Sequence, residues 1–156
     1  MYSILLKLSR NIFFYNKINL PDNFETRIYL MFIHFSIMML ISKKKGKKFD
    51  QKTYDILFNK IEYNLRETGY GDVTVNKKMK ELNKILYDIL LKLELSENYG
   101  KSFKLNHNLI IKYFNTLNDS KSSKYPQFET YFLNFYNFCF ELPLDNMIKD
   151  IEKFKY

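Results

Sequence analysis

Apolar residues recur along this chain at spacings of three and four positions, which is the period of an amphipathic α-helix. No segment of useful length alternates apolar and polar residues as a β-strand does, and there is no internal repeat. The predicted fold is therefore all-α, a single compact bundle of about six to seven helices in one domain over residues 1–156. The pattern predicts helices over residues 2–16, 23–42, 50–68 and 75–95, a short one over 105–114, and two more beginning at Pro126 and Pro143.

The second predicted helix is the most apolar part of the chain. Residues 28–41 are almost wholly apolar, and His34 and Ser36 interrupt them. A membrane-spanning helix needs roughly 20 such residues, so this run is too short to span a bilayer. We expect a buried central helix instead, with His34 as a core histidine held by one hydrogen-bond partner.

The turn between the third and fourth predicted helices, residues 65–75, is the most distinctive stretch of the sequence. Gly69 and Gly71 stand two positions apart in a chain with only four glycines. Gly69 is placed to end a helix in the left-handed conformation, which costs glycine little. Asp72 or Thr74 is then expected to cap the next helix by accepting hydrogen bonds from its free N–H groups.

Other breaks are marked by proline, lysine and small polar residues. Leu20-Pro21-Asp22 breaks the chain after the first helix, and Asp22 with Glu25 has the spacing of a capping box for the second. The lysine-rich run 43–48 predicts a solvated loop after the second helix. Residues 98–104 are expected to form a loop, and residues 119–124 (DSKSSK) a linker.

The charge balance restricts the kinds of partner. The chain carries 25 Lys and Arg against 17 Asp and Glu, a formal net charge of +8. Such a surface favours nucleic acid, a ribosome or acidic lipid headgroups, and simple solubility in a lysine-rich proteome is the alternative. The first 21 residues lack acidic side chains and weakly resemble a mitochondrial presequence, but their apolar spacing favours a packed first helix.

Catalytic motifs are missing from the sequence. The chain lacks glycine-rich phosphate loops, a nucleophile elbow and an HExxH zinc motif. Cys139 is the only cysteine, which excludes an internal disulfide, and nothing in its context links it to His34 or His107. Glu62 and Glu67 lie five positions apart and therefore on different faces of a helix. We expect no enzyme, cofactor, metal or small-molecule substrate.

Two features indicate binding. Lys77, Lys78 and Lys80 fall in the first turn of the predicted fourth helix, where cations oppose the helix dipole, so we hypothesise that they serve an external anion. A solvated helix face is the alternative. The 13 Tyr and 15 Phe residues exceed what one core of this size easily encloses. Some of these rings are expected to line an apolar surface groove that suits an amphipathic or membrane-destined helix.

Motifs in residues 20–90 carry a family resemblance. Residues 20–27 read LPDNFETR, Leu57-Phe58 follows, residues 62–75 read EYNLRETGYGDVTV, and residues 77–80 read KKMK. In this order and spacing they resemble the ubiquinol–cytochrome c chaperone family, assembly factors for the respiratory bc1 complex. The chain departs from the family at residues 87–89, which read YDI where the family has YGR, and the last third is similar only in length and helical character.

The resemblance implies a non-enzymatic chaperone that holds newly made cytochrome b until it receives haem. It further implies the ribosomal tunnel exit and a small co-chaperone as partners of the mitochondrial members, and we add a transient contact with an anionic membrane surface. The expected location is the bacterial cytoplasm beside the inner membrane, or the mitochondrial matrix in a eukaryote. The alternative function is a basic helical RNA- or ribosome-binding regulatory module.

Four residues of these motifs are expected to work together. Arg27, Arg66, Glu67 and Asp72 are predicted to organise the corner between the third and fourth helices. Structural ion pairing or helix capping is one interpretation of each, and direct contact with the client is the other.

Overall fold

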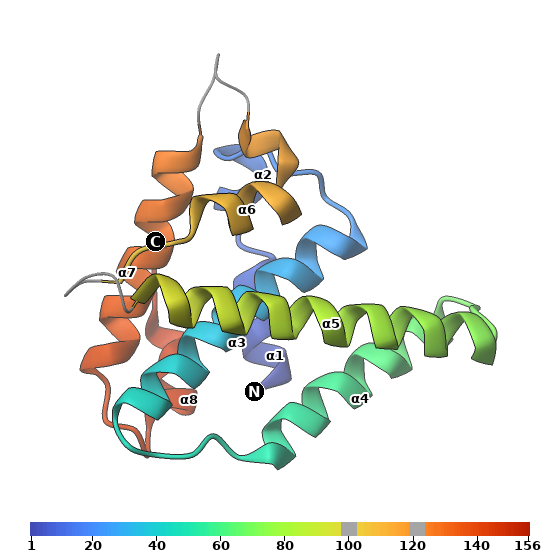
Figure 1. Ribbon diagram of the computed structural model, residues 1–156, viewed down its shortest axis with the longest axis horizontal. Helices are drawn as coiled ribbons and strands as arrows, with labels where there is room; N and C mark the ends of the chain where they lie inside the picture. The colour runs from blue at the N-terminus through green and yellow to red at the C-terminus, as the bar shows by residue number, and fades with distance from the viewer. Residues whose placement is uncertain (98–102, 119–123) are drawn as a thin grey trace.

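The computed structural model describes residues 1–97, 103–118 and 124–156, and these residues form helices and no strand (Figure 1). The all-α prediction is confirmed. The loop predicted over 98–104 and the linker predicted over 119–124 lie mostly outside the described residues. The elements are α1 (Tyr2–Ser9), α2 (Ile12–Asn16), α3 (Phe24–Lys44), α4 (Gln51–Glu67), α5 (Asp72–Glu97), α6 (His107–Tyr113), η1 (Asn115–Asn118), α7 (Tyr125–Glu141), α8 (Met147–Asp150) and η2 (Ile151–Lys153), where η marks a 3-10 helix.

Helix α3 is the central element. Helices α1, α5 and α7 all pack against it. The buried side chains of α3 lie on all of its sides. Among the described helices, α3 alone is long and apolar enough to cross a membrane, but 72% of its most apolar stretch is buried inside the protein. The core helix of a globular protein has the same properties. The predicted buried central helix is confirmed, and it extends beyond the apolar run 28–41.

The first predicted helix is broken in two. Helix α1 ends at Ser9 and α2 begins at Ile12, so the prediction of one helix over 2–16 is wrong. Between them, Asn11 leaves the helical region, and its Oδ1 accepts a hydrogen bond from the Phe13 N–H at 3.0 Å. An asparagine that caps a new helix competes with continuation of the old one. The break turns Phe14 into the core, where it is 0% exposed.

Many of the Tyr and Phe side chains are buried inside the protein. Helix α7 begins at Tyr125 with Pro126 in its first turn, as predicted, and presents its aromatic stripe to the core. Phe128, Tyr131 and Phe132 are fully buried, and their ring centroids lie 4.6–6.0 Å from that of Phe14. Edge-on and stacked ring pairs of this kind stabilise a core beyond their buried area. The core therefore encloses more rings than the sequence suggested.

Helices α4 and α5 form a hairpin whose tip projects away from the other helices (Figure 1). Leu57, Ile61 and Leu65 are the buried side chains of α4, on the face that the helical period predicted. They are 0–2% exposed because α4 packs on α5 and also contacts α1. The N-terminal half of α5 completes the hairpin, and its C-terminal half crosses α3 (Figure 1).

Candidate functional site

The turn at the tip of the hairpin has the conformation that its glycine predicts. Gly69 adopts φ +91°, in the left-handed region, and its N–H donates to the carbonyl of Arg66 at 3.1 Å. The Thr68 hydroxyl donates to the carbonyl of Leu65 at 2.7 Å, which satisfies another free carbonyl of the last turn. Gly71 does not have positive φ, and an added Cβ there would meet nothing within 4 Å. Of the two glycines, only Gly69 is required by the backbone.

Arg66 links the two arms of the hairpin. Its Nη2 lies 2.9 Å from Glu62 Oε1 one turn earlier on α4, and its Nη1 pairs with Asp72 at the start of α5. Helix α5 begins at Asp72 rather than at Val75, so the carboxylate pairs with Arg66 and does not act as the predicted N-cap. An acidic group in the first turn also interacts favourably with the helix dipole. Both ion pairs are at the surface, where they contribute little to stability.

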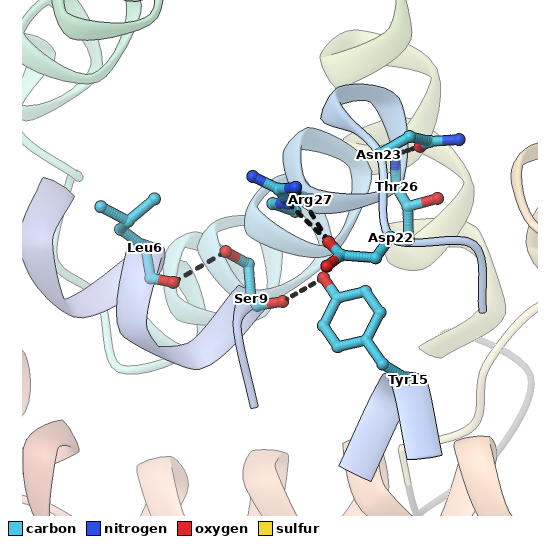
Figure 2. A network of polar contacts seen from close by, with 7 residues as sticks. All are labelled: Leu6, Ser9, Tyr15, Asp22, Asn23, Thr26 and Arg27. Carbon is cyan, nitrogen blue, oxygen red and sulfur yellow. Dashed lines mark hydrogen bonds and ion pairs between the residues drawn. The ribbon is translucent and has the colours of Figure 1, made fainter. Parts of the chain in front are cut away.

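Arg27 and Glu67 have other partners. Arg27 pairs with Asp22 at 2.9 Å at the entry to α3, so its predicted place in the corner between α4 and α5 is wrong (Figure 2). Glu67 accepts a hydrogen bond from the Tyr63 hydroxyl on the outer face of α4, and this bond raises the pKa of Tyr63. The motif residues therefore serve two separate helix ends.

The entry to α3 also corrects the predicted capping box. The N-cap is Asn23, whose Oδ1 accepts a hydrogen bond from the Thr26 N–H at 2.9 Å, and not Asp22 (Figure 2). Asp22 faces Arg27 instead, and the Tyr15 hydroxyl lies nearby while donating to the carbonyl of Ser9 at 2.7 Å (Figure 2). Burial, followed by the charge of Asp22, raises the pKa of Tyr15. These contacts hold the segment between α1 and α2 close to the start of α3.

The lysines of α5 lie farther along the helix than the sequence predicted. Because α5 begins at Asp72, Lys77, Lys78 and Lys80 follow its first turn, and the premise that they oppose the helix dipole is wrong. Lys77 and Lys80 are exposed, and the Lys78 ammonium lies 5.0 Å from the centre of the Tyr70 ring. These residues form a cationic surface beside the tip.

The tip also exposes apolar side chains. Val73 is 84% exposed, Tyr63 59% and Tyr70 46%. Apolar groups rimmed by charges are typical of a surface that contacts a partner. We call residues 63–80, with this mixture of exposed apolar and cationic groups, the hairpin tip.

A hollow of about 560 Å³ lies between α3, the turn after it and α5. We call it the α3–α5 pocket. Its size is within the range of small-molecule sites, and its walls are mostly apolar. Lys43 forms an ion pair with Glu94 at its rim, and Lys47 pairs with Asp145 at 2.9 Å. The lining residues are Ser36, Met39, Leu40, Lys43, Gly46, Lys47, Lys48, Phe49, Leu90 and Glu94.

Sequence reasoning found only part of this pocket. It marked the lysine run 43–48 as a solvated loop, but it missed the apolar wall from Met39, Leu40 and Leu90. Ser36, an interruption of the apolar run, was the available signal. Its hydroxyl is buried and has no hydrogen-bond partner among the described residues.

His34 is a core residue. It is 0% exposed, which excludes direct contact with a partner in this structure, and it has two hydrogen-bond partners where one was predicted. Nδ1 donates to the carbonyl of Leu30 at 2.7 Å, so Nε2, at 3.0 Å, accepts from the Tyr131 hydroxyl on α7. Burial lowers the pKa of His34 to about 4, although the bond to Leu30 opposes this shift. The imidazole is therefore neutral at physiological pH and ties α3 to α7.

Cys139, the only cysteine of the chain, is a buried free thiol. Burial raises the pKa of the Cys139 thiol to about 12, so the thiol stays protonated at neutral pH. Within residues 1–97, 103–118 and 124–156, no group of three or more His, Cys, Asp or Glu side chains is placed to hold a metal ion. The hairpin tip and the α3–α5 pocket are the candidate functional surfaces.

Comparison with known proteins adds one finding. A family model described as Ubiquinol-cytochrome C chaperone matches residues 16–137. The matched segment runs from the end of α2 into α7 and includes both the hairpin tip and the α3–α5 pocket. No curated protein and no solved structure matches the chain.

Proposed function

Because the chain belongs to the ubiquinol–cytochrome c chaperone family, we propose that it is a non-enzymatic assembly factor that holds newly made cytochrome b during formation of the bc1 complex. A membrane protein that has not reached its bilayer exposes apolar helices, which aggregate in water. A folded helical scaffold with exposed apolar groups shields such a segment. No bond needs to be made or broken for this task.

The proposal rests on the exposed groups of the hairpin tip, in a chain that belongs to this family. It presents Tyr63, Tyr70 and Val73 to solvent on a narrow projection that a partner reaches from several sides. Neighbouring cations, Lys77 and Lys80, add attraction to an anionic surface. We propose that the apolar groups contact the client, while the lysines hold the protein near ribosomal RNA or acidic lipid. A small co-chaperone, as in the mitochondrial members, is a further proposed partner.

The proposed location follows from the proposed client. Cytochrome b is made on the side of the membrane where ribosomes work, so the chaperone would act in the bacterial cytoplasm beside the inner membrane, or in the mitochondrial matrix of a eukaryote. The net charge of +8 supports attachment to an anionic surface there.

The decisive experiment removes the gene and measures assembled bc1 complex through its haem b absorption. We expect loss of the haem b signal and restoration by the wild-type gene. A variant with Val73→Asp and Tyr70→Ser should restore it poorly, because its tip is no longer apolar. Normal haem b absorption in the deletion strain would refute the proposal.

Cross-linking tests the contact directly. A photo-reactive amino acid at Val73 should capture nascent cytochrome b, and the same group at Thr130, exposed on α7, serves as the matched control. The rival function, a basic RNA-binding module, predicts that nuclease treatment releases every partner. Retention of cytochrome b after nuclease treatment favours the chaperone.

A further inference from the structure

The α3–α5 pocket combines three kinds of chemistry. Its walls are apolar, from Met39, Leu40 and Leu90. Cationic side chains stand around its rim on the turn after α3. One buried hydroxyl, from Ser36, belongs to its lining. A ligand that matches all three must have an apolar body, an anionic group and a hydrogen-bond acceptor.

The Ser36 hydroxyl is the sharpest of these signals. Ser36 is 1% exposed, and among the described residues its Oγ is the one buried side-chain polar atom without a hydrogen-bond partner. A serine inside a helix usually donates to the carbonyl four residues earlier, and an unpaired buried hydroxyl is costly. Ser36 is thus a lining residue of the pocket with an unpaired hydroxyl. An acceptor atom on a ligand would satisfy it.

The cations of the rim are not equivalent. Lys43 is neutralised by Glu94, and Lys47 by Asp145. Lys48 is exposed and forms no ion pair with any described residue. The next residue, Phe49, packs its ring edge-on against Phe35 at 5.2 Å between centroids, so the lysine-bearing turn lies beside the Ser36 end of the pocket.

We propose that the α3–α5 pocket binds one anionic glycerophospholipid molecule, with an acyl chain along Met39, Leu40 and Leu90. In such a lipid an ester carbonyl lies between the acyl chain and the phosphate. The pocket offers a partner for each of these groups, because the carbonyl accepts from Ser36 and the phosphate faces Lys48. The site does not depend on the proposed chaperone function, and it would give the protein a lipid-specific contact with the membrane.

Other occupants match fewer of these groups. A free phosphate makes no use of the apolar walls, and a neutral apolar molecule leaves Ser36 unpaired and Lys48 without a counter-charge. A membrane-destined helix carries Lys and Arg at its cytoplasmic ends, which the lysines of the rim would repel. The combination of donor, cation and apolar wall favours the lipid.

Isothermal titration calorimetry of the full chain tests the proposal with three soluble probes. Short-chain phosphatidylglycerol supplies the acyl chain, the carbonyl and the charge. Short-chain phosphatidylcholine lacks the net charge, and glycerol phosphate lacks the acyl chain. We expect phosphatidylglycerol to bind at one site and about tenfold more tightly than either of the other two probes. Equal binding of glycerol phosphate would overturn the proposal, since the apolar walls would then have no role.

Three variants locate the site. Ser36→Ala should weaken phosphatidylglycerol binding roughly fivefold while leaving the lipid-free protein equally or more heat-stable, because an unpaired buried hydroxyl is removed. Leu90→Trp should abolish binding by filling the pocket, and Lys48→Glu should weaken it. The matched control is Lys84→Glu on the exposed part of α5 outside the hairpin tip, which makes the same charge change away from the pocket and should leave the affinity unchanged.

Two results would overturn the assignment. One is unchanged affinity in both Ser36→Ala and Lys48→Glu, two substitutions that the fold tolerates because one removes a single atom and the other lies at the surface. The other is equal loss in Lys84→Glu and Lys48→Glu, which would mean that the lipid is held by overall charge. Neither result concerns haem b in a deletion strain, so the two proposals fail independently.

Discussion

The core around α3 and α7 and the hairpin tip are built on opposite principles. In the core, His34, Phe128 and Tyr131 are fully enclosed, and each contact replaces water by packed side chains. At the tip, Arg66, Tyr70 and Val73 remain in water, and their ion pairs and backbone bonds shape a turn without burying it. The comparison shows that buried packing sustains the fold, while the ion pairs of the exposed tip add little to stability.

The largest expected effect tests the core side of this comparison. Phe132→Ala should lower the free energy of unfolding by about 3 to 5 kcal/mol, because it removes a fully buried ring and leaves a cavity beside Phe14. Phe140→Ala on the same helix is the matched control, since that ring is 43% exposed. Urea denaturation measures both variants. Equal losses would mean that α7 does not contribute its aromatic stripe to the core.

The second effect is a pH dependence that originates in the core. The pKa of His34 is about 4 in the folded protein and 6.5 ordinarily, so the unfolded chain takes up the proton first as the pH falls. Above pH 6.5 the protonation of His34 therefore does not lower the free energy of unfolding. Between pH 6.5 and pH 4 this residue alone should lower the free energy of unfolding by about 3 kcal/mol.

The control for the histidine is His34→Gln, which is expected to be less stable at neutral pH but to lack this part of the pH dependence. Denaturation curves of both proteins at several pH values give the comparison. Parallel pH profiles would show that the imidazole does not stay neutral in the fold.

A smaller effect is expected at the turn of the hairpin. Gly69→Ala should cost about 1 to 2 kcal/mol, because φ +91° places the new Cβ against its own backbone. Gly71→Ala makes the same chemical change at a residue without positive φ and with open space around it, so its free energy of unfolding should stay within about 0.5 kcal/mol of the wild type. Thermal denaturation distinguishes the two. The same loss at both glycines would contradict the assigned turn.

The smallest effect on stability is expected from Arg66→Ala. Asp72 is exposed and Glu62 is half-buried at the surface, so the melting temperature should stay close to that of the wild type even though the turn loses its ion pairs. Under the proposed function, cross-linking from Val73 to cytochrome b should nevertheless decrease, because the tip is no longer held in one arrangement. A large drop in melting temperature would mean that the tip stabilises the fold, as the core does, and would contradict the comparison.

Helix by helix, the sequence was a good guide where one element decides its own conformation. Periodicity placed α4 and α7, because a helix face must be apolar where it packs, and the almost wholly apolar run 28–41 placed α3. Gly69 predicted the left-handed end of α4, because no other residue type adopts that conformation so cheaply. The exceptions lie at helix starts, where several polar side chains compete for the capping position. Asn11 caps α2, which the sequence pattern had joined to α1 in one helix. Asn23 caps α3, where the sequence pattern had predicted Asp22.

Tertiary structure alone decided which distant residues meet. Arg27 and Arg66 both belong to the family-like motifs, but they form ion pairs at the ends of different helices. His34 forms a hydrogen bond with Tyr131, which lies 97 positions away in the sequence. The α3–α5 pocket joins Ser36 to Leu90, and no periodicity predicts that α5 crosses α3 so as to leave a hollow there. Local pattern determines which face of a helix avoids water. Packing against other helices determines how well each face is filled, so a hollow such as the α3–α5 pocket exists only in the assembled fold.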